Sequence, residues 1–549
     1  MGVTPLGREP ASSSAIARVA LLAALFLGCS PLACGVESGA VGQSPPESSN
    51  ARPVEQTFDV LEYEVEGNSV LTNLQIEKAV YPYLGYAKTI KDVESARTAL
   101  EKVYREHGFL TVFVDIPEQQ VDAGVVVLRV TEGRVSKLAV TGNRYYSRGA
   151  IRAQVPELSP GQVPNFTEVQ QQVAQLNKNA NRQVTPVLRA GTAPGTVDIE
   201  LKVDDKAPWH ADLELNNNQS PNTPPLRLQG SVRYDNLWQK EHSVSLFYQT
   251  APQEPQDLSV VSGSYLLPMW DSNVLALYAL HSNSQVAAVG GVNVVGTGTI
   301  AGARAVFPLP AREGLFQSVT LGIDYKNLDE SVLQGTGMIE TPITYVPLMA
   351  QYRANWQNKT TSTEAQFTLN MAPRGLFGNS DEEFEQKRFN AKASYVYLRA
   401  GWKTQLLLGR GFQLLTRLEG QLSNQPLVSS EQFCLGGVYS VRGYLECESL
   451  GDNGLFGSIQ IARALSLPPS LSDIQGLTLF AFVDAGDTTL IDALPGQTDH
   501  FTQASLGLGL HFSAFRHLDG DLDVAFPTEN SVDTKAWNPR ILFRLAYGF

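Results

Sequence analysis

The chain has 549 residues, a length that is too great for one ordinary domain and suits two or three. Its formal net charge is −13 and its sequence has no run rich in Lys or Arg, which argues against a nucleic-acid partner. A mean hydropathy of −0.12 excludes a bundle of transmembrane helices.

Residues 1–40 are expected to be a signal peptide region that directs the chain out of the cytoplasm. Their only long apolar run, Val19–Leu27, follows two arginines and is far shorter than the ~20 residues of a spanning helix. Cleavage is plausible at the small residues that end this region, while Cys29 leaves a lipoprotein site open as an alternative. Residues 41–57 are rich in Ser and Pro, poor in apolar side chains, and predict a linker.

Residues 58–133 predict a small α/β domain with the element order β-α-α-β-β. Its longer helix places apolar side chains at helical spacing on one face, which is typical of a helix packed against a core. The expected elements are strand Val60–Val65, helices Asn73–Leu84 and Asp92–Glu106, and strands Leu110–Ile116 and Val125–Val130.

Residues 134–206 repeat this order at a similar size, although the two sequences are not visibly alike. Two successive units of one order and size indicate an internal repeat. The expected elements are strand Val135–Thr141, helices Gly149–Val155 and Thr167–Leu176, and strands Arg182–Leu188 and Val197–Val203.

Residues 207–549 show no helix pattern and instead alternate apolar and polar side chains in short segments. Connections rich in Ser, Asn, Asp, Gly and Pro separate these segments, which indicates an all-β region. The expected strands are Arg227–Asp235, Ser243–Gln249, Asn273–His281, Ser318–Tyr325, Ala365–Met371, Ala393–Arg399, Gln413–Gln421, Leu477–Val483, Ala504–Phe512 and Arg540–Phe549.

The last strand is the most informative of these segments. One face is wholly apolar, whereas the other carries small residues and Arg544. This pattern is typical of a transmembrane β-barrel, which closes on itself because the bilayer core offers no water to an unpaired sheet edge. The two terminal aromatic residues on the apolar face are expected to act as a recognition signal for barrel assembly: Tyr547 and Phe549.

The Gly-rich stretch Glu431–Gly454 carries Arg442 near its centre, and an apolar strand further along the chain contains Asp484. A charge in such a strand is costly unless it is paired, and Arg442 is the expected partner. Asp484 shares its face of the strand with Phe480 and Phe482, opposite an aliphatic face that suits lipid. Asp484 is therefore expected to face the barrel lumen.

Cys434 and Cys447 lie thirteen positions apart on either side of Arg442. A hairpin tip between them would bring the two thiols together, and an oxidising compartment would allow a disulfide. Two independent thiols in a wide loop are the alternative.

Catalytic residues, metal ligands and cofactors are not expected. The seven histidines are scattered without the spacing of a metal site. The sequence lacks both a nucleophile-elbow pattern and a phosphate-loop pattern. It therefore predicts a protein that is not an enzyme.

Several motifs, in order and at workable spacing, resemble those of one family. They are Arg182–Leu188 in the second α/β unit, Arg233–Trp238 early in the β region, a loop motif of Val441, Arg442, Gly443 and Tyr444, and a strand motif that includes Phe480, Phe482, Asp484 and Gly486. From Phe58 to Phe549 the chain resembles the outer-membrane transporters of two-partner secretion, the TpsB proteins of the ShlB/FhaC/HecB type. The two α/β units resemble POTRA domains.

This resemblance implies a sixteen-stranded barrel in the outer membrane of a Gram-negative bacterium, with both POTRA domains in the periplasm. It implies that the loop bearing Arg442 folds back into the lumen and pairs there with Asp484. The implied function is export of an unfolded, β-rich client of the TpsA type. The other implied partners are outer-membrane lipid and the barrel assembly machinery. Many members carry a plug helix, for which residues 35–56 show no convincing pattern.

Family geometry also implies where the client binds, because each small sheet should leave an open edge strand that an extended chain can join. The candidate contact residues on these edges are Thr111, Phe113, Thr185 and Val187. One alternative function is a membrane-protein insertase of the same superfamily, although such relatives usually carry more than two POTRA units. The other is a passive diffusion porin, which needs no periplasmic repeats and lacks the loop motif.

Overall fold

The computed structural model describes residues 56–549, except positions 122, 285, 290, 291, 296, 330, 335 and 336. The described chain divides into two compact units between Ala207 and Pro208. The expected signal region 1–40 and nearly all of the expected linker 41–57 lie outside the described residues. The lipoprotein alternative at Cys29 and the segment considered for a plug helix lie outside them too. Within the described part of the chain, no helix is both long enough and apolar enough to cross a membrane.

The first α/β domain packs two helices against a three-stranded sheet. Its elements are β1 (Phe58–Val60), β2 (Glu62–Glu66), α2 (Asn73–Val80), η1 (Tyr81–Tyr83), β3 (Gly85–Lys88), α3 (Ile90–Glu106), β4 (Val112–Asp115) and β5 (Val125–Glu132). β5 is the central strand, with β2 parallel on one side and β4 antiparallel on the other. The expected order of elements is present, with two additional short strands, β1 and β3, that pair with each other in a separate sheet.

Local sequence explains where the two helices begin and end. Each starts at a threonine that forms a reciprocal capping box, Thr72 with Gln75 and Thr89 with Asp92. α2 ends before Pro82, because proline has no N–H to continue the ladder of main-chain hydrogen bonds. The apolar helix faces close one core with the sheet, which includes Val93, Leu100, Tyr104, Val114 and Leu128.

The second α/β domain repeats the arrangement. Its elements are β6 (Arg134–Thr141), α4 (Arg148–Ala153), η2 (Pro156–Leu158), α5 (Phe166–Leu176), β7 (Arg182–Ala190) and β8 (Thr196–Asp205). β8 lies between a parallel β6 and an antiparallel β7. The same strand order in both sheets leaves β4 and β7 as equivalent edges.

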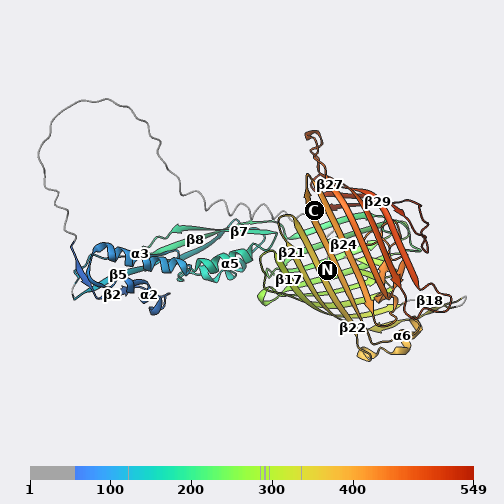
Figure 1. Ribbon diagram of the computed structural model, residues 1–549, viewed down its shortest axis with the longest axis horizontal. Helices are drawn as coiled ribbons and strands as arrows, with labels where there is room; N and C mark the ends of the chain where they lie inside the picture. The colour runs from blue at the N-terminus through green and yellow to red at the C-terminus, as the bar shows by residue number, and fades with distance from the viewer. Residues whose placement is uncertain are drawn as a thin grey trace. The chain divides into compact units, whose positions relative to one another are not determined.

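The second unit of the chain is a closed antiparallel barrel (Figure 1). Its strands are β9 (Trp209–Asn216), β10 (Arg227–Leu237), β11 (His242–Thr250), β12 (Ser259–Pro268), β13 (Val274–Ser282), β16 (Thr297–Pro308), β17 (Leu315–Asp329), β20 (Ile343–Tyr345), β21 (Leu348–Gln357), β22 (Thr361–Ala372), β23 (Tyr395–Gly409), β24 (Phe412–Ser423), β27 (Asn453–Ala464), β28 (Ile474–Thr489), β29 (His500–Ala514), β30 (Leu518–Pro527) and β31 (Arg540–Gly548). β20 and β21 both pair with β17 as two pieces of one strand, so the barrel has the expected sixteen strands. β31 pairs with β9 and closes it.

The alternating pattern revealed ten of these strands and missed the other six, which are β9, β12, β16, the β20–β21 strand, β27 and β30. β16 shows why the pattern fails. Its lumen-facing Arg304 alternates with Ala301, Ala303 and Ala305 on the opposite face. Small residues on the lipid side give little contrast in hydropathy, so the strand does not stand out from a loop.

Smaller elements lie in the connections between barrel strands. They are the hairpins β14 (Val286–Val289) with β15 (Val292–Val295), β18 (Ser331–Gln334) with β19 (Gly337–Glu340), and β25 (Phe433–Leu435) with β26 (Ser449–Gly451), and the helix α6 (Asp381–Lys387).

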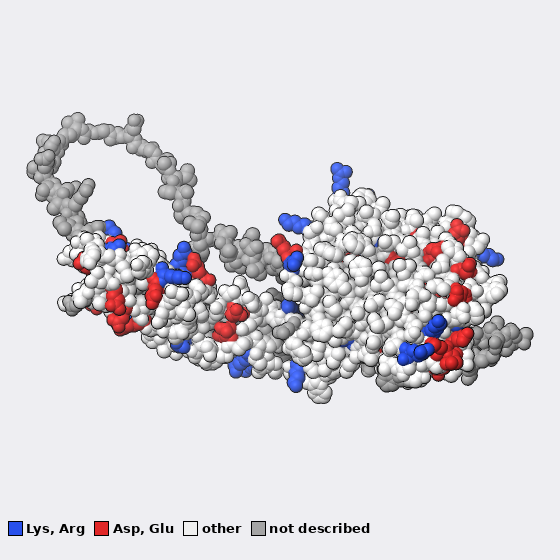
Figure 2. Space-filling model, turned by 60° about the horizontal axis from the view of Figure 1, so that its bottom comes forward, with Lys and Arg blue, Asp and Glu red and all other residues white. Residues whose placement is uncertain are grey.

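The outer face of the barrel is apolar, and several of its aromatic residues lie at the end with the short turns. Aliphatic side chains such as Leu479, Val483 and Leu508 are exposed there. In the face that Figure 2 shows, charged side chains are sparse along the barrel wall and gather toward its ends. The exposed aromatics at the end with the short turns include Trp209, Trp238, Trp270, Trp356 and Phe412. Such a belt marks the membrane interface, and short turns mark the periplasmic end of an outer-membrane barrel.

On each edge strand of the α/β domains, side chains cover the outward main-chain groups of one residue. On β4, the N–H of Val114 donates to Glu101 Oε1 at 3.2 Å, and its carbonyl accepts from Arg97 at 3.5 Å. On β7, Asn177 Oδ1 accepts from the N–H of Val184 at 2.6 Å, and Asn177 Nδ2 donates to the carbonyl of Val184 at 2.9 Å. These caps blunt edges that would otherwise pair with any extended chain.

Replacing Asn177 with Ala should uncover the main chain of Val184. The lost hydrogen bond contributes about 0.5–1.5 kcal/mol net to the stability of this edge. The Val184 amide should therefore exchange with deuterium roughly two- to tenfold faster. Hydrogen-exchange mass spectrometry of the detergent-solubilised protein measures this rate. Gln171→Ala, at an exposed position on the same helix, is the control. Equal exchange in both variants would contradict the cap.

Candidate functional site

The candidate site is the lumen loop, residues 424–452, which joins β24 to β27. It leaves the barrel at the end opposite the short turns and turns back inside. Val441 and Tyr444 near its tip are at most 1% exposed, and Phe433, Leu435 and Phe456 share one apolar cluster with them. The loop tip therefore lies against the inner wall, as the sequence comparison with secretion transporters implied.

Arg442 at the loop tip and Asp484 on β28 form a buried, two-pronged ion pair. Arg442 Nε lies 2.7 Å from Asp484 Oδ2, and Arg442 NH2 lies 2.9 Å from Asp484 Oδ1. The Arg442 main-chain N–H also donates to Asp484, at 3.2 Å. Asp484 is 0% exposed. The fork geometry of guanidinium and carboxylate makes this the strongest class of charge-assisted contact.

Neighbouring wall residues complete the surroundings of the pair. Ser458 Oγ on β27 donates to Asp484 Oδ1 at 2.6 Å, and Gln460 Oε1 accepts from Arg442 NH1 at 3.0 Å. The guanidinium lies 3.4 Å from the ring centroid of Phe482, which adds a cation–π contact. Phe482 is buried while Val483 is 60% exposed, so the strand faces are those that parity predicted.

The other motif residues shape the place where the tip sits. Gly443 has φ of +96°, and a Cβ there would lie 3.1 Å from atoms of Ala525 and Pro527 on the wall. Tyr444 Oη lies 3.0 Å from the carbonyl oxygen of Ala504 and 2.9 Å from that of Glu529, both of which can accept its proton. These contacts extend the fixation of the tip from β28 to β29 and to the connection after β30.

The strand motif contributes two further positions. Phe480 is half-buried, and its ring lies 6.4 Å from that of Phe482. A Cβ on Gly486 would lie 2.4 Å from Leu435, because the loop hairpin presses directly on β28 at this point. Glycine at position 486 therefore makes room for the loop rather than for a turn.

A disulfide joins Cys434 and Cys447. It closes the tip segment that carries Arg442 into a covalent ring, with Cys434 in β25 and Cys447 two residues before β26. Of the two states left open by the sequence, the structure contains the bonded one. The tip is consequently a stapled unit, so motion of the loop has to occur at its connections to the barrel.

The lumen loop also contains buried carboxylates that the sequence did not mark as site residues. Glu431, Glu446, Glu448 and Asp452 are all buried. Glu448 accepts from the main chain and hydroxyl of Thr534, and Asp452 accepts from the N–H groups of Leu427 and Ile491. Four acidic residues in one Gly-rich loop were a visible signal, but their partners lie on distant strands and loops that local sequence does not identify.

The candidate client-binding residues differ in how accessible they are. Phe113 on β4 is 63% exposed and Thr185 on β7 is exposed, whereas Val187 is half-buried. Thr111 is buried, precedes β4, and donates its hydroxyl to the carbonyl of Gly133 at 3.0 Å. Thr111 therefore offers no free side chain to a client, because its polar group is already bonded.

The C-terminal aromatics lie on the outer face near the periplasmic end. Tyr547 and Phe549 are 39% and 62% exposed, and their rings are 4.8 Å apart. In the described part of the chain, no group of three or more His, Cys, Asp or Glu side chains is placed to hold a metal ion.

Comparisons with known proteins agree with this geometry. Residues 195–512, more than half of the chain, match the family described as haemolysin secretion/activation protein ShlB/FhaC/HecB, and residues 58–133 match the ShlB-type POTRA domain. Outer membrane transporter CdiB of Dickeya dadantii (strain 3937) is 23% identical over 423 residues, which cover 74% of this chain and 71% of that protein. Heme/hemopexin transporter protein HuxB of Haemophilus influenzae (strain 86-028NP) is 20% identical, over 82% of this chain and 80% of that protein.

A solved structure, CdiB from Escherichia coli, shares the fold with a TM-score of 0.61 at 18% identity, and the match covers 92% of this chain and 93% of that one. The POTRA-type region, the closed barrel and the family match together place the protein in the outer membrane. The chain belongs to the haemolysin secretion/activation family ShlB/FhaC/HecB.

Proposed function

We propose that this protein is the outer-membrane pore of a two-partner secretion system. Its two α/β domains, at 58–133 and 134–206, act as POTRA domains that receive an unfolded, β-rich partner protein in the periplasm. The barrel then conducts that partner to the cell surface. The observation that carries the proposal is the lumen loop, which a buried ion pair holds inside a closed barrel.

The loop explains how a pore for an unfolded chain stays shut at rest. Val441 and Tyr444 fill space against the inner wall, while Arg442 and Asp484 fix the tip there. A passive diffusion porin would have no use for the two α/β domains. The family match likewise favours secretion over membrane-protein insertion.

The edge strands β4 and β7 are where an extended client can pair. Along an edge strand, the main-chain N–H and C=O groups point alternately toward the neighbouring strand and away from the sheet. On β7 the groups that point away include those of Val184, Pro186 and Leu188. Asn177 occupies the first of these, and Pro186 has no N–H to offer. The stretch Leu188–Ala190 is the open part of this edge, and a longer client strand has to displace the Asn177 cap.

Two further partners belong to the proposal. The apolar outer face of the barrel contacts outer-membrane lipid, and the terminal aromatics Tyr547 and Phe549 are recognised by the barrel assembly machinery during biogenesis. The two aromatic side chains are accessible for this purpose on the outside of the barrel.

Removal of the tip clamp tests the proposed pore. Arg442→Ala strands the buried Asp484 charge, and losing one partner of a buried pair can cost ~3–5 kcal/mol in a dry interior, less in a wet lumen. We expect secretion of the client to fall while the barrel still inserts. Immunoblots of secreted client, together with the heat-dependent gel shift of the folded barrel, measure the two effects.

Arg353→Ala is the control for the loss of an arginine from the barrel, because Arg353 forms a partly exposed pair with the wall residue Glu364 at 3.4 Å rather than with the lumen loop. It should leave secretion near the wild-type level. Loss of both the gel shift and secretion in Arg442→Ala would make the pair a folding clamp and would count against a role in transport.

Crosslinking tests the edge strands as the client site. A photoreactive residue at Phe113 or at Thr185 should capture the N-terminal segment of a client, because both side chains lie beside an edge. The same residue at Lys102, whose side chain is 73% exposed on α3, should not. Absence of adducts at both edge positions, with secretion intact, would refute client pairing at these edges.

A further inference from the structure

The root of the lumen loop contains a second buried charge that the proposed mechanism has not used. Glu431 ends the short helical turn η5 (Ser429–Glu431), eight residues after β24 ends and before the stapled tip begins at Cys434. It is only 2% exposed. An ionised carboxylate in such a place requires both a counter-charge and hydrogen-bond donors.

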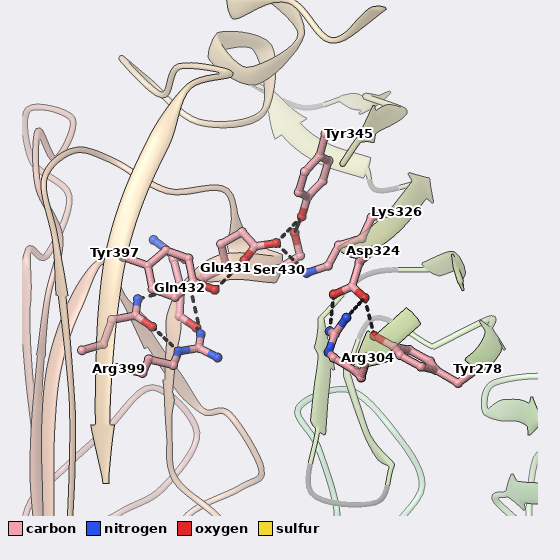
Figure 3. A network of polar contacts seen from close by, with 11 residues as sticks. Tyr278, Arg304, Asp324, Lys326, Tyr345, Tyr397, Arg399, Ser430, Glu431 and Gln432 are labelled. Atoms are coloured by element: carbon pink, nitrogen blue, oxygen red, sulfur yellow. Dashed lines mark hydrogen bonds and ion pairs between the residues drawn. The ribbon is translucent and has the colours of Figure 1, made fainter. Parts of the chain in front are cut away.

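Three side chains from the barrel wall supply them. Lys326 Nζ on β17 lies 2.5 Å from Glu431 Oε1, and Tyr345 Oη on β20 donates to the same oxygen at 2.7 Å. Tyr397 Oη on β23 donates to Oε2 at 2.7 Å. Figure 3 shows these three side chains converging on Glu431. Both carboxylate oxygens are satisfied, and the charge is balanced.

The main chain at the root is held as well. Arg399 NH2 on β23 donates to the carbonyls of Glu431 and Gln432, at 3.1 and 3.2 Å. Gln421 Nε2 on β24 donates to the same Glu431 carbonyl and to that of Asp452, at 3.1 and 3.0 Å. The two ends of the loop are thereby tied to each other as well as to the wall.

The root and the tip use separate parts of the barrel. Glu431 is held by β17, β20 and β23, whereas Arg442 is held by β27 and β28. The two anchors share no bonding partner among these contacts, and the disulfide between Cys434 and Cys447 makes the intervening tip one covalent unit. These two anchors therefore hold the loop on different stretches of wall.

We propose that Glu431 is a second positioning residue of this pore, which holds the root of the lumen loop against β17, β20 and β23 independently of the Arg442 clamp. When the tip is released, the root keeps the stapled segment at the wall and within reach of its clamp. The role of this anchor in transport rests on the proposed pore function. The effect of the anchor on the loop can be measured separately, as the frequency of channel openings.

Planar-bilayer recordings of the purified full-length protein test this anchor. Glu431→Gln keeps the shape of the side chain and leaves Lys326 without a counter-charge, so large-conductance openings should become at least about fivefold more frequent, since a buried charge is stranded. Combining Glu431→Gln with Arg442→Ala should multiply the two single effects, because independent sites add in free energy. Exchanging the charges, with Lys326→Glu and Glu431→Lys together, should restore most of the wild-type gating.

Asp324→Asn is the matched control. Asp324 lies two positions from Lys326 on β17 and forms a largely buried pair with Arg304 at 2.6 Å, joined by Tyr278. Figure 3 shows this pair beside the Glu431 cluster. The bonds of this pair join barrel-wall strands to one another and do not involve the lumen loop. Loss of the pair should therefore not raise the frequency of large openings.

Three results would overturn the inference: wild-type gating in Glu431→Gln, an equal rise in Asp324→Asn, or a double variant no different from Arg442→Ala. If Glu431→Gln did not give the folded-barrel gel shift, Tyr397→Phe, which removes one donor only, would take its place with the same expected direction. A wild-type protein that gates but secretes no client would refute the proposed function and leave the comparison of anchors intact.

Discussion

A chain that crosses a bilayer as strands has no water with which to complete its main-chain hydrogen bonds, and the barrel of this protein is built around that constraint. β31 pairs with β9, so the strands that begin and end the sheet lie side by side. Closure of the sheet also encloses a lumen. Sixteen strands surround a lumen that needs to be filled or gated, and the lumen loop does this with charged groups that would be intolerable in lipid.

The buried charges of Arg442 and Glu431 in the loop are acceptable because each has a specific partner of opposite charge on the barrel wall. Arg442 and Asp484 neutralise each other on one stretch of wall, while Glu431 and Lys326 do so on another. Such pairs add little net stability over apolar packing, but they enforce one position, since a displaced partner leaves a stranded charge. A loop held this way is well defined at rest and can still be released as a unit.

The α/β domains face the opposite problem, because they retain open edges. β4 and β7 are the free edges through which an unfolded client can pair, yet a free edge also invites unwanted association. Glu101, Arg97 and Asn177 cover part of each edge with side-chain groups that imitate a strand. A client that offers a full ladder of main-chain bonds can displace such caps, whereas a chance contact gains less from doing so.

Local sequence was sufficient for the features that depend on periodicity and on motif residues. The two β-α-α-β-β units and the outward face of β31 followed from spacing of apolar residues alone, and strand parity alone placed Asp484 toward the lumen. Six barrel strands escaped this method, because small residues on the lipid side of strands such as β16 remove the contrast that a pattern needs.

Only the tertiary structure decided which distant groups meet. Glu431 lies close to the loop motif in the sequence, but its partners Lys326, Tyr345 and Tyr397 come from strands that are distant in sequence. Local sequence therefore did not identify Glu431 as an anchor. Thr111 was expected at an accessible edge and is instead bonded to Gly133. The alternation of apolar and polar residues predicts which way a side chain points. The partner that the side chain contacts depends on how the barrel closes and how the loop folds back.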